Sequence, residues 1–449
     1  MSVLELNTGD TAWVLISAAL VLLMTPGLAL FYGGMVRAKS VLNMFMMSII
    51  TMGVVGLLWV LFGFSMVFGS SWHGLIGNPI EFAGLRGTMD ALIGAEGNQI
   101  PLLVFVGFQS AFAIIAVALV SGAVADRMKF SAWVGFAVLW ATLVYFPAAH
   151  WVFAFDGVVS DRGGWIANQV KAFDFAGGTA IHINAGVAAL VLALVVGPRL
   201  GFGTKPMRPH NLTLVMLGAG LLWFGWFGFN AGSALGANGL AGLAWVNTLA
   251  GAAAAMLAWL VVEKIRDQHA TSLGAASGIV AGLVAITPAC AVVTPMGALA
   301  VGALAGVCCA LAVGLKHRFH IDDSLDVVGV HLVGGLVGTL AIGLVGTNEL
   351  TGGSAGLFYG GGLEQLGRQA MGAAAVLVFS AVMTTLIAYT LKFTIGLRAS
   401  AQQESSGLDL ASHAEVGYDL SNVGYSTYRV RSSLVVPVTR AEADKEALR

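Results

Sequence analysis

The chain has 449 residues, of which 57% are hydrophobic and only 10% are charged. A soluble globular protein carries about 25% charged residues, and a soluble fold of this size cannot bury so much apolar surface. Most of that surface must face lipid or other buried helices. The composition therefore excludes a cytoplasmic enzyme, a secreted disulfide scaffold and a disordered protein. The formal net charge of −1 gives no indication of nucleic-acid binding.

Apolar runs long enough to cross a bilayer recur along the whole chain. A membrane helix needs about 20 mostly apolar residues, and the eighth run is shorter than the others and ends at Thr287-Pro288. The first run follows acidic residues and lacks the basic segment of a signal peptide, so we expect a mature helix there. The expected spans are 12–32, 42–68, 101–122, 131–152, 176–196, 212–235, 239–262, 271–287, 292–315, 327–346 and 370–395.

The basic residues between these spans are unevenly distributed. Connections after odd-numbered spans hold eleven Lys and Arg residues, and those after even-numbered spans hold four. Because cytoplasmic loops carry the excess of basic residues, we expect the N-terminus outside and the C-terminus in the cytoplasm. We divide the chain into a transmembrane domain, 1–395, and a polar cytoplasmic tail, 396–449, which ends in a mixed-charge segment from Arg440 to Arg449. The tail is too short for a catalytic domain.

The fifth and tenth spans share a short pattern. An acidic residue at the helix start (Asp174, Asp326) is followed by a histidine inside an apolar run (His182, His331) and by a glycine four residues later. Helices five spans apart cross the membrane in opposite senses. The shared pattern therefore favours two repeats of opposite orientation, as in many transporters, with the substrate site at the interface between the repeats.

A single buried histidine is usually a packing residue bonded to a nearby carbonyl. Two histidines at matching places, His182 and His331, favour a functional pair, because polar groups in the bilayer usually face a pathway. No third ligand is near them, so we expect neither a metal site nor a cofactor. If the two imidazoles meet, desolvation keeps both neutral, and one can donate a hydrogen bond to the other.

Aromatic residues in the third and sixth spans share helix faces. Phe108 and Phe112 are four residues apart, as are Phe229 and Ser233, so each pair lies on one side of its helix. With the expected topology, Phe108 and Ser233 lie at an outer level, and Phe112 and Phe229 lie one turn deeper. These residues either pack against lipid and core, or form an outer cation site above an apolar gate.

The aspartates at the helix starts have a simpler explanation. Asp174 and Asp326 are expected to cap helix N-termini, and Asp174 can also favour the arrival of a cation. Asp322 and Asp323 are expected to be solvated or capping. The sequence contains no metalloprotease, hydrolase or phosphate-binding motif, so no enzymatic activity is expected.

At these residues the sequence resembles the Amt/Mep/Rh ammonium transporter family, specifically its bacterial Amt branch. The resemblance covers nearly the whole chain, from Pro26-Gly27-Leu28-Ala29-Leu30-Phe31-Tyr32-Gly33-Gly34 to Gly407-Leu408-Asp409-Leu410. Its most specific pieces are Asp174-Phe175-Ala176-Gly177-Gly178-Thr179 with His182, Gly228-Phe229-Asn230-Ala231-Gly232-Ser233, and Asp322-Asp323-Ser324-Leu325-Asp326 with His331.

The resemblance implies an all-α membrane protein of the inner cell membrane. It implies eleven transmembrane helices, in two inverted five-helix repeats plus a long final helix, assembled as a homotrimer with one pore per subunit. The tail resembles a segment that docks on the cytoplasmic face and takes part in control by PII-type proteins. The positions that match the family are Phe108 and Ser233 in the outer ammonium site, Phe112 and Phe229 in the gate, His182 and His331 in the pore, and Asp174 near the outer mouth.

One position departs from the family. The family places a Trp in the outer site after an Ala-His-x-Val stretch, whereas here Ala149-His150-Trp151-Val152 is followed by Phe153. A Phe ring is a weaker cation partner than Trp, and Trp151 is expected to point away from the site. The substitution implies lower affinity or altered selectivity at the outer site.

Together these features predict an ammonium transporter that also accepts methylammonium. The outer site selects NH4+, the gate strips its water, and NH3 passes the histidines, with the proton following. Three alternatives stay open: an ammonium sensor that acts through its tail, a neutral NH3 channel of the Rh type, and an intramembrane enzyme that uses His and Asp.

Overall fold

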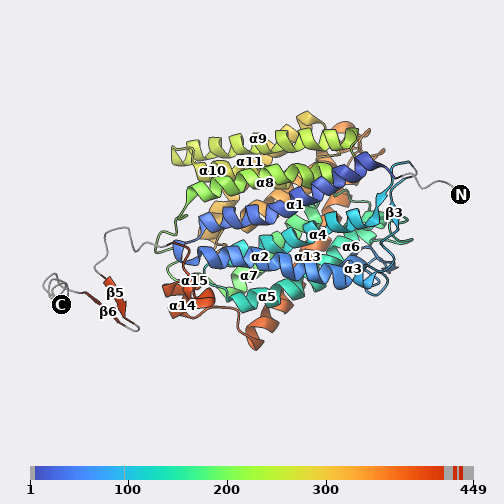
Figure 1. Ribbon diagram of the computed structural model, residues 1–449. Helices are drawn as coiled ribbons and strands as arrows, with labels where there is room; N and C mark the ends of the chain where they lie inside the picture. The colour runs from blue at the N-terminus through green and yellow to red at the C-terminus, as the bar shows by residue number, and fades with distance from the viewer. Residues whose placement is uncertain (1–5, 96, 419–427, 432–433, 438–449) are drawn as a thin grey trace.

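The computed structural model describes residues 6–95, 97–418, 428–431 and 434–437. The expected mixed-charge segment from Arg440 to Arg449 lies outside these residues. The membrane part is a bundle of long helices that run side by side (Figure 1). This is the all-helical architecture expected from the composition.

Ten helical spans in the described part of the chain are long and apolar enough to cross a bilayer. An eleventh helix, α10 (Ser272–Ile286), has 15 residues and occupies the place of the expected span 271–287. Each expected span therefore has its helix. The ten long spans are Thr8–Met35, Ala38–Phe68, Leu102–Val124, Phe130–Phe153, Gly178–Val196, Leu212–Gly232, Gly239–Asp267, Pro295–Arg318, Val328–Val345 and Glu364–Thr394.

The spans combine α-helices with turns of other helix types. The α-helices are α1 (Thr8–Met35), α2 (Val41–Leu58), α3 (Phe64–Phe68), α4 (Leu102–Val120), α5 (Phe130–Trp140), α6 (Phe146–Phe153), α7 (Asn184–Val196), α8 (Leu212–Gly232), α9 (Gly239–Asp267), α11 (Pro295–Arg318), α12 (Val333–Val345) and α13 (Glu364–Thr394). The π-helical turns are η2 (Trp59–Gly63), η5 (Ala141–Tyr145), η6 (Ile166–Val170), η7 (Gly178–Ile183) and η8 (Val328–Leu332).

Shorter elements lie in the connections. The 3-10 turns are η1 (Ala38–Ser40), η3 (Ala83–Leu85), η4 (Ser121–Val124) and η9 (Leu357–Tyr359). The strands form three antiparallel pairs, β1 (Ser71–Trp72) with β2 (Ile76–Gly77), β3 (Leu92–Ile93) with β4 (Ile100–Pro101), and β5 (Tyr428–Arg431) with β6 (Leu434–Pro437).

The short helix α10 is enclosed by the rest of the bundle. Every residue from Gly274 to Ile286 except Ala275 is buried, and so is the turn from Thr287 to Val293. The helix ends before Pro288, because proline has no backbone N–H with which to continue the helical hydrogen bonds. Non-helical backbone at membrane depth is tolerated where protein covers it, so this span does not need full length.

The fifth and tenth spans are built alike, as the inverted-repeat plan requires. Each begins with a π-helical turn that contains the buried histidine, and each continues as a 13-residue α-helix, α7 or α12. The two helices also contact each other in matching ways. A Cβ on Gly186 would lie 2.4 Å from the Leu332 nitrogen, and a Cβ on Gly335 would lie 3.0 Å from Ile183. Only glycine lets the two backbones approach this closely.

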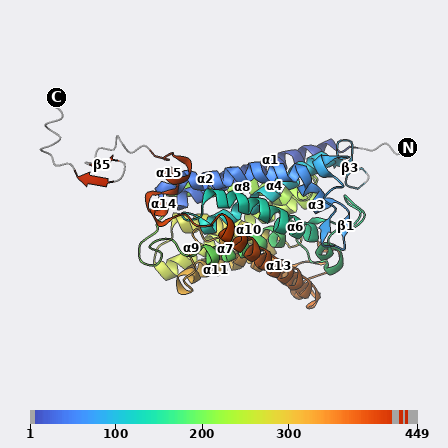
Figure 2. The ribbon, with the colours of Figure 1, turned by 90° about the horizontal axis from the view of Figure 1, so that it is seen from below.

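The two ends of the bundle differ. The start of α1 and the β3–β4 pair lie at one end, which we call the N-terminal end (Figure 1). Helices α14 (Ala401–Ser406) and α15 (Leu408–His413) lie at the opposite end, which we call the tail end (Figures 1 and 2). The polar segment after α13 therefore lies at the opposite end of the bundle from the start of α1 and the β3–β4 pair.

The described part of the tail is anchored by buried carboxylates. Glu404 in α14 accepts a hydrogen bond from the Leu200 amide at 2.6 Å and pairs with Arg398 at 2.8 Å. Asp409 in α15 accepts from the Asn43 amide at 2.7 Å. Both carboxylates are buried, so these contacts hold α14 and α15 against the helix bundle.

Candidate functional site

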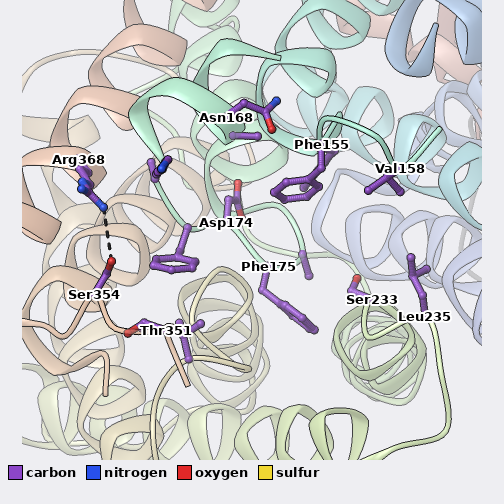
Figure 3. A pocket seen from close by; sticks show the side chains of 18 of the residues that line it. Phe155, Val158, Asn168, Asp174, Phe175, Ser233, Leu235, Thr351, Ser354 and Arg368 are labelled. Atoms are coloured by element: carbon purple, nitrogen blue, oxygen red, sulfur yellow. Dashed lines mark hydrogen bonds between the residues drawn. The ribbon is translucent and has the colours of Figure 1, made fainter. Parts of the chain in front are cut away.

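A cavity of about 740 Å³ opens at the N-terminal end of the bundle, and we call it the vestibule. Four residues of the predicted site line it: Phe112, Phe153, Asp174 and Ser233. Figure 3 shows Asp174, Phe175 and Ser233 around this space. The third, fourth, fifth and sixth spans therefore bring predicted residues to one cavity, although these residues are far apart in sequence.

Ser233 directly follows α8, and its hydroxyl donates to the Phe229 carbonyl at 2.8 Å. Because the hydroxyl proton is used in this bond, the oxygen lone pairs remain to accept a hydrogen bond from a guest. Phe153 is the last residue of α6 and is half-buried at the same cavity. Together they offer an acceptor and an aromatic ring, as a small N–H cation requires.

Trp151 does not contribute to the vestibule. Its indole N–H donates to the Leu75 carbonyl at 2.7 Å, and its ring packs against Phe379 with centroids 4.5 Å apart. The expectation that Trp151 points away from this cavity is confirmed.

Phe112 lines the vestibule, and Phe229 stacks against it and lines the cavity of the histidines. Their rings stack with centroids 4.3 Å apart and planes 26° apart, and both side chains are buried. Phe108 packs edge-on against Phe112 at 4.8 Å and is fully buried. The α4 residues that line the vestibule are Phe105, Gln109 and Phe112. Phe108 therefore supports the ring pair from behind and does not line the cavity itself.

His182 and His331 meet below the ring pair. Their Nδ1 atoms are 3.3 Å apart, so one imidazole donates to the other, and the ring planes are 25° apart. Both side chains are buried. The predicted contact between the two imidazoles is present. Within the described part of the chain, Nε2 of His182 has no hydrogen-bond partner, so this nitrogen is available to a small molecule beside it.

The cavity around the two histidines is narrow and apolar. Its volume is about 10 Å³, close to the minimum that holds one water molecule. Its walls combine the histidines with aliphatic and aromatic side chains, among them Leu28, Phe31 and Ile115. Such a space is too small for an ion with its hydration shell, and its apolar walls cannot replace the lost water molecules.

Trp226, which the sequence pattern alone does not single out, is also a wall of this cavity. Its ring lies parallel to that of His182, with centroids 5.5 Å apart. The indole N–H donates to the Thr287 hydroxyl at 2.8 Å. A signal was present in the sequence, because Trp226 precedes Phe229 by three residues and so shares its helix face.

Asp174 acts as the cap that the sequence predicts. Its two carboxylate oxygens accept hydrogen bonds from the amides of residues 177–180 at 2.7–3.1 Å, at the start of η7. Burial raises the pKa of Asp174 above its ordinary value, and the four amide hydrogen bonds oppose this shift. The carboxylate therefore fixes the segment that carries His182.

The prediction for Asp326 is wrong in its detail. Its carboxylate pairs with Lys316 at 2.5 Å, and the Val328 amide at the start of η8 donates to Asp323 at 2.7 Å. Asp323 lies eight residues before His331, as Asp174 lies eight residues before His182. Asp323 is therefore the counterpart of Asp174. Asp326 is nearer to η8 in sequence, but the short connection after Asp323 folds so that the Asp323 carboxylate reaches the Val328 amide.

Asp322 and Asp323 were expected to be either solvated or capping. Both are buried, so they are not solvated, whereas Asp323 is capping, because it accepts from the Val328 amide. Asp322 pairs with Arg199 at 2.7 Å. Although burial alone would raise the pKa of Asp322, the hydrogen bonds and charge of Arg199 bring it below its ordinary value. Burial and the neighbouring Asp326 raise the pKa of Asp323 to about 6. These carboxylates are thus structural groups of the tail end.

The vestibule is not uniformly negative. Lys171 and Arg368 line it together with Asp174. Arg368 donates to the Ser354 hydroxyl at 3.5 Å, a contact drawn in Figure 3. The Asp174 carboxylate already accepts hydrogen bonds from four amides.

The chain matches known proteins over most of its length. The Ammonium Transporter Family profile matches residues 12–418. An ammonium transporter of Mycobacterium tuberculosis (strain ATCC 25618 / H37Rv) is 62% identical over 432 residues, covering 92% of this chain and 91% of the relative. An ammonium transporter of Bacillus subtilis (strain 168) is 45% identical over 416 residues, covering 92% of this chain and 99% of the relative.

Solved structures agree with these relatives. A protein described as "Sensor Amt Protein" superposes with a TM-score of 0.82 at 30% identity, covering 90% of this chain and 98% of that chain. Mep2 of Candida albicans superposes with a TM-score of 0.81 at 29% identity, covering 96% and 95%. The chain is therefore a multi-pass membrane protein that belongs to the ammonium transporter family, in its bacterial Amt branch.

Proposed function

We propose that the protein moves ammonium across the membrane by binding NH4+ in the vestibule, removing its proton and passing NH3 along the histidine pair. The observation that carries this proposal is the order of the groups. The Phe112–Phe229 pair lies between the vestibule and the histidines, and the Phe229 and His182 rings are 6.2 Å apart. A guest that leaves the vestibule meets an apolar barrier and then a pair of nitrogen atoms.

Recruitment depends on the contacts in the vestibule. A cation over aromatic faces gains about 0.5–2 kcal/mol, and Ser233 supplies a lone pair. Phe105 lines the cavity, while Phe108 packs against Phe112. We therefore assign NH4+ binding to Ser233, Phe153 and the face of Phe112, with Phe108 as their support.

Selectivity follows from the cost of desolvation. An intact ion in the narrow histidine cavity would pay several kcal/mol, whereas neutral ammonia would pay much less. Potassium has a similar charge and size but cannot shed a proton, so it is refused. Methylammonium can release a proton, so labelled methylammonium can replace ammonium in uptake measurements.

The released proton follows over the histidine pair. A hydrogen bond between His182 and His331 lets one ring accept a proton while the other gives one up. Net transport then carries charge. A neutral gas channel of the Rh type would carry none, so electrical current separates these two mechanisms.

We also assign the setting of the protein. It works as a homotrimer in the inner membrane, with the N-terminal end outside and the tail end in the cytoplasm. The tail, residues 396–449, is a regulatory segment on which a PII-type protein acts. The docked carboxylates Glu404 and Asp409 support this assignment, because their contacts join the tail to the ends of the spans.

A sensor is the second candidate, because one structural neighbour bears the description "Sensor Amt Protein". A sensor would bind ammonium and pass little of it. The test is purified protein in liposomes, assayed for uptake of labelled methylammonium and for current under an ammonium gradient. Transport requires both signals to exceed those of empty liposomes. Binding without uptake would instead establish the sensor, and uptake without current the neutral channel.

A further inference from the structure

The final helix of the bundle reaches into the vestibule wall through one amide side chain. Gln369 in α13 is fully buried. Its Oε1 accepts from the Phe173 amide at 2.7 Å, and its Nε2 donates to the Phe173 carbonyl at 2.7 Å. A single side chain therefore pairs with both backbone groups of Phe173, as a neighbouring strand would.

The Gln369 amide is itself held in one orientation. Its Nε2 also donates to the Thr339 carbonyl in α12 at 3.1 Å, and its Oε1 also accepts from Nε2 of Gln365 at 2.9 Å. Phe173 belongs to the first half of the fold and Thr339 to the second. Gln369 thus joins the two repeats, although α13 is part of neither.

The clamped residue lies next to the most heavily bonded carboxylate of the site. Phe173 immediately precedes Asp174, and both line the vestibule. The Asp174 carboxylate in turn holds the four amides that open η7, the turn that carries His182. The Gln369–Phe173 contact therefore fixes the backbone immediately before Asp174, which caps η7 and lines the vestibule.

We propose that Gln369 is a positioning residue for ammonium recruitment: it clamps Phe173 and thereby sets the place of Asp174 and of the vestibule wall relative to the outer site. The effect on transport rests on the proposed function. The effect on the backbone around Phe173 does not, and can be measured without transport. Without the clamp, the N–H and C=O groups of Phe173 lose their partners in a half-buried position, which backbone groups avoid by shifting.

Two variants test the clamp. Gln369→Leu removes all of its hydrogen bonds at similar volume. Gln369→Glu keeps the shape, but an ionised carboxylate cannot donate to the Phe173 and Thr339 carbonyls, whereas a protonated one can donate to one of them. Thr384→Val is the matched control, since it removes a different buried hydrogen bond of α13, the one that Trp140 donates at 3.0 Å.

Methylammonium uptake into liposomes gives the functional readout, normalised to folded protein. We expect Gln369→Leu to raise KM about tenfold, on the scale of a lost pair of buried hydrogen bonds, with a smaller change in the maximal rate. Gln369→Glu should match this rise at pH 8 and return toward the wild-type KM as the pH is lowered. Thr384→Val should keep the wild-type KM at every pH.

Hydrogen–deuterium exchange gives a readout that needs no transport. Peptides that cover residues 172–180 should exchange faster in Gln369→Leu than in the wild type, and should be unchanged in Thr384→Val. Unchanged exchange there, or a wild-type KM in Gln369→Leu with only a lower melting temperature, would overturn the positioning role. If the wild type itself takes up no methylammonium, the proposed function fails, and exchange alone decides the role of Gln369.

Discussion

The indole ring of Trp226 lies nearly parallel to the imidazole of His182, with planes 19° apart and centroids 5.5 Å apart. The ring of Trp226 also packs against that of Phe229, with ring centroids 5.3 Å apart. One side chain therefore contacts both Phe229 and His182. The hydrogen bond from Trp226 to Thr287 ties this arrangement to the end of α10, so the short eighth span supports the narrowest part of the proposed pathway.

We expect Trp226→Leu to weaken the selectivity of the protein. Removing a buried aromatic ring leaves space next to His182, and water that enters this space lowers the cost of passing an ion. A potassium current, absent in the wild type, should therefore appear beside the ammonium current, so that the ratio of the two currents falls. Thr287→Val removes the acceptor of the indole N–H and the hydrogen bond from the Thr287 hydroxyl to the Leu283 carbonyl, but it keeps the Trp226 ring and should leave potassium excluded. Potassium exclusion in both variants would show that the Trp226 ring does not guard the cavity.

Restoring a tryptophan at the outer site should tighten recruitment. Trp is a better cation partner than Phe by about 0.5–1 kcal/mol, so Phe153→Trp should lower the KM for methylammonium about two- to fivefold. Trp151→Phe, which changes a ring outside the vestibule, should leave KM unchanged. Uptake measured over a range of methylammonium concentrations checks both. An unchanged KM in Phe153→Trp would remove position 153 from the recruitment site.

The contact between the two histidine helices should tolerate no added methyl group. A Cβ on Gly186 would lie 2.4 Å from the Leu332 nitrogen, so Gly186→Ala must push the helices apart and should lower the melting temperature markedly. Gly220 in α8 has open space around it, and Gly220→Ala should be neutral or stabilising by about 0.5–1 kcal/mol. Thermal unfolding in detergent compares the two. Equal melting temperatures would contradict the close approach.

Asp323 gives the stability of the protein a predictable pH dependence. Its pKa in the folded protein is about 6, above that of an unfolded chain, so the ionised form is the one that folding disfavours. Stability is gained as the pH falls through about 6 toward the unfolded value, and lost again as the pH rises. Asp323→Asn still accepts from the Val328 amide but cannot ionise.

The measurement is the difference in melting temperature between the wild type and Asp323→Asn, followed from pH 8 to pH 5. The wild type should gain a few degrees relative to the variant as the pH falls. A constant difference would mean that Asp323 does not titrate in this range. The comparison reports Asp323 together with its charged neighbours Asp326 and Lys316, whose fields act on its pKa.

Much of this protein is readable from its residues, and the limits have a physical basis. Hydropathy marks each span because lipid demands long apolar runs, and i to i+4 spacing places Phe112 and Ser233 on the faces that line the vestibule. His182 and His331 are conspicuous because imidazoles are rare inside apolar helices.

Features that depend on contacts between distant segments were not predictable. Gln369 and Phe173 are 196 residues apart in sequence, and nothing in either neighbourhood indicates their pairing. Asp323 was confused with Asp326 because the sequence does not show where η8 begins. Phe108 was placed at the cavity because helix spacing assigns a face but not the neighbour that covers it.

The central claim is that ammonium crosses only by giving up its proton to a wall that carries two imidazoles. The most direct test measures ammonium and potassium currents in liposomes with the wild type and with His182→Ala combined with His331→Ala. We predict ammonium current without potassium current in the wild type. In the double variant, either the ammonium current disappears or potassium passes as well. A double variant that still conducts ammonium and still refuses potassium would contradict the account.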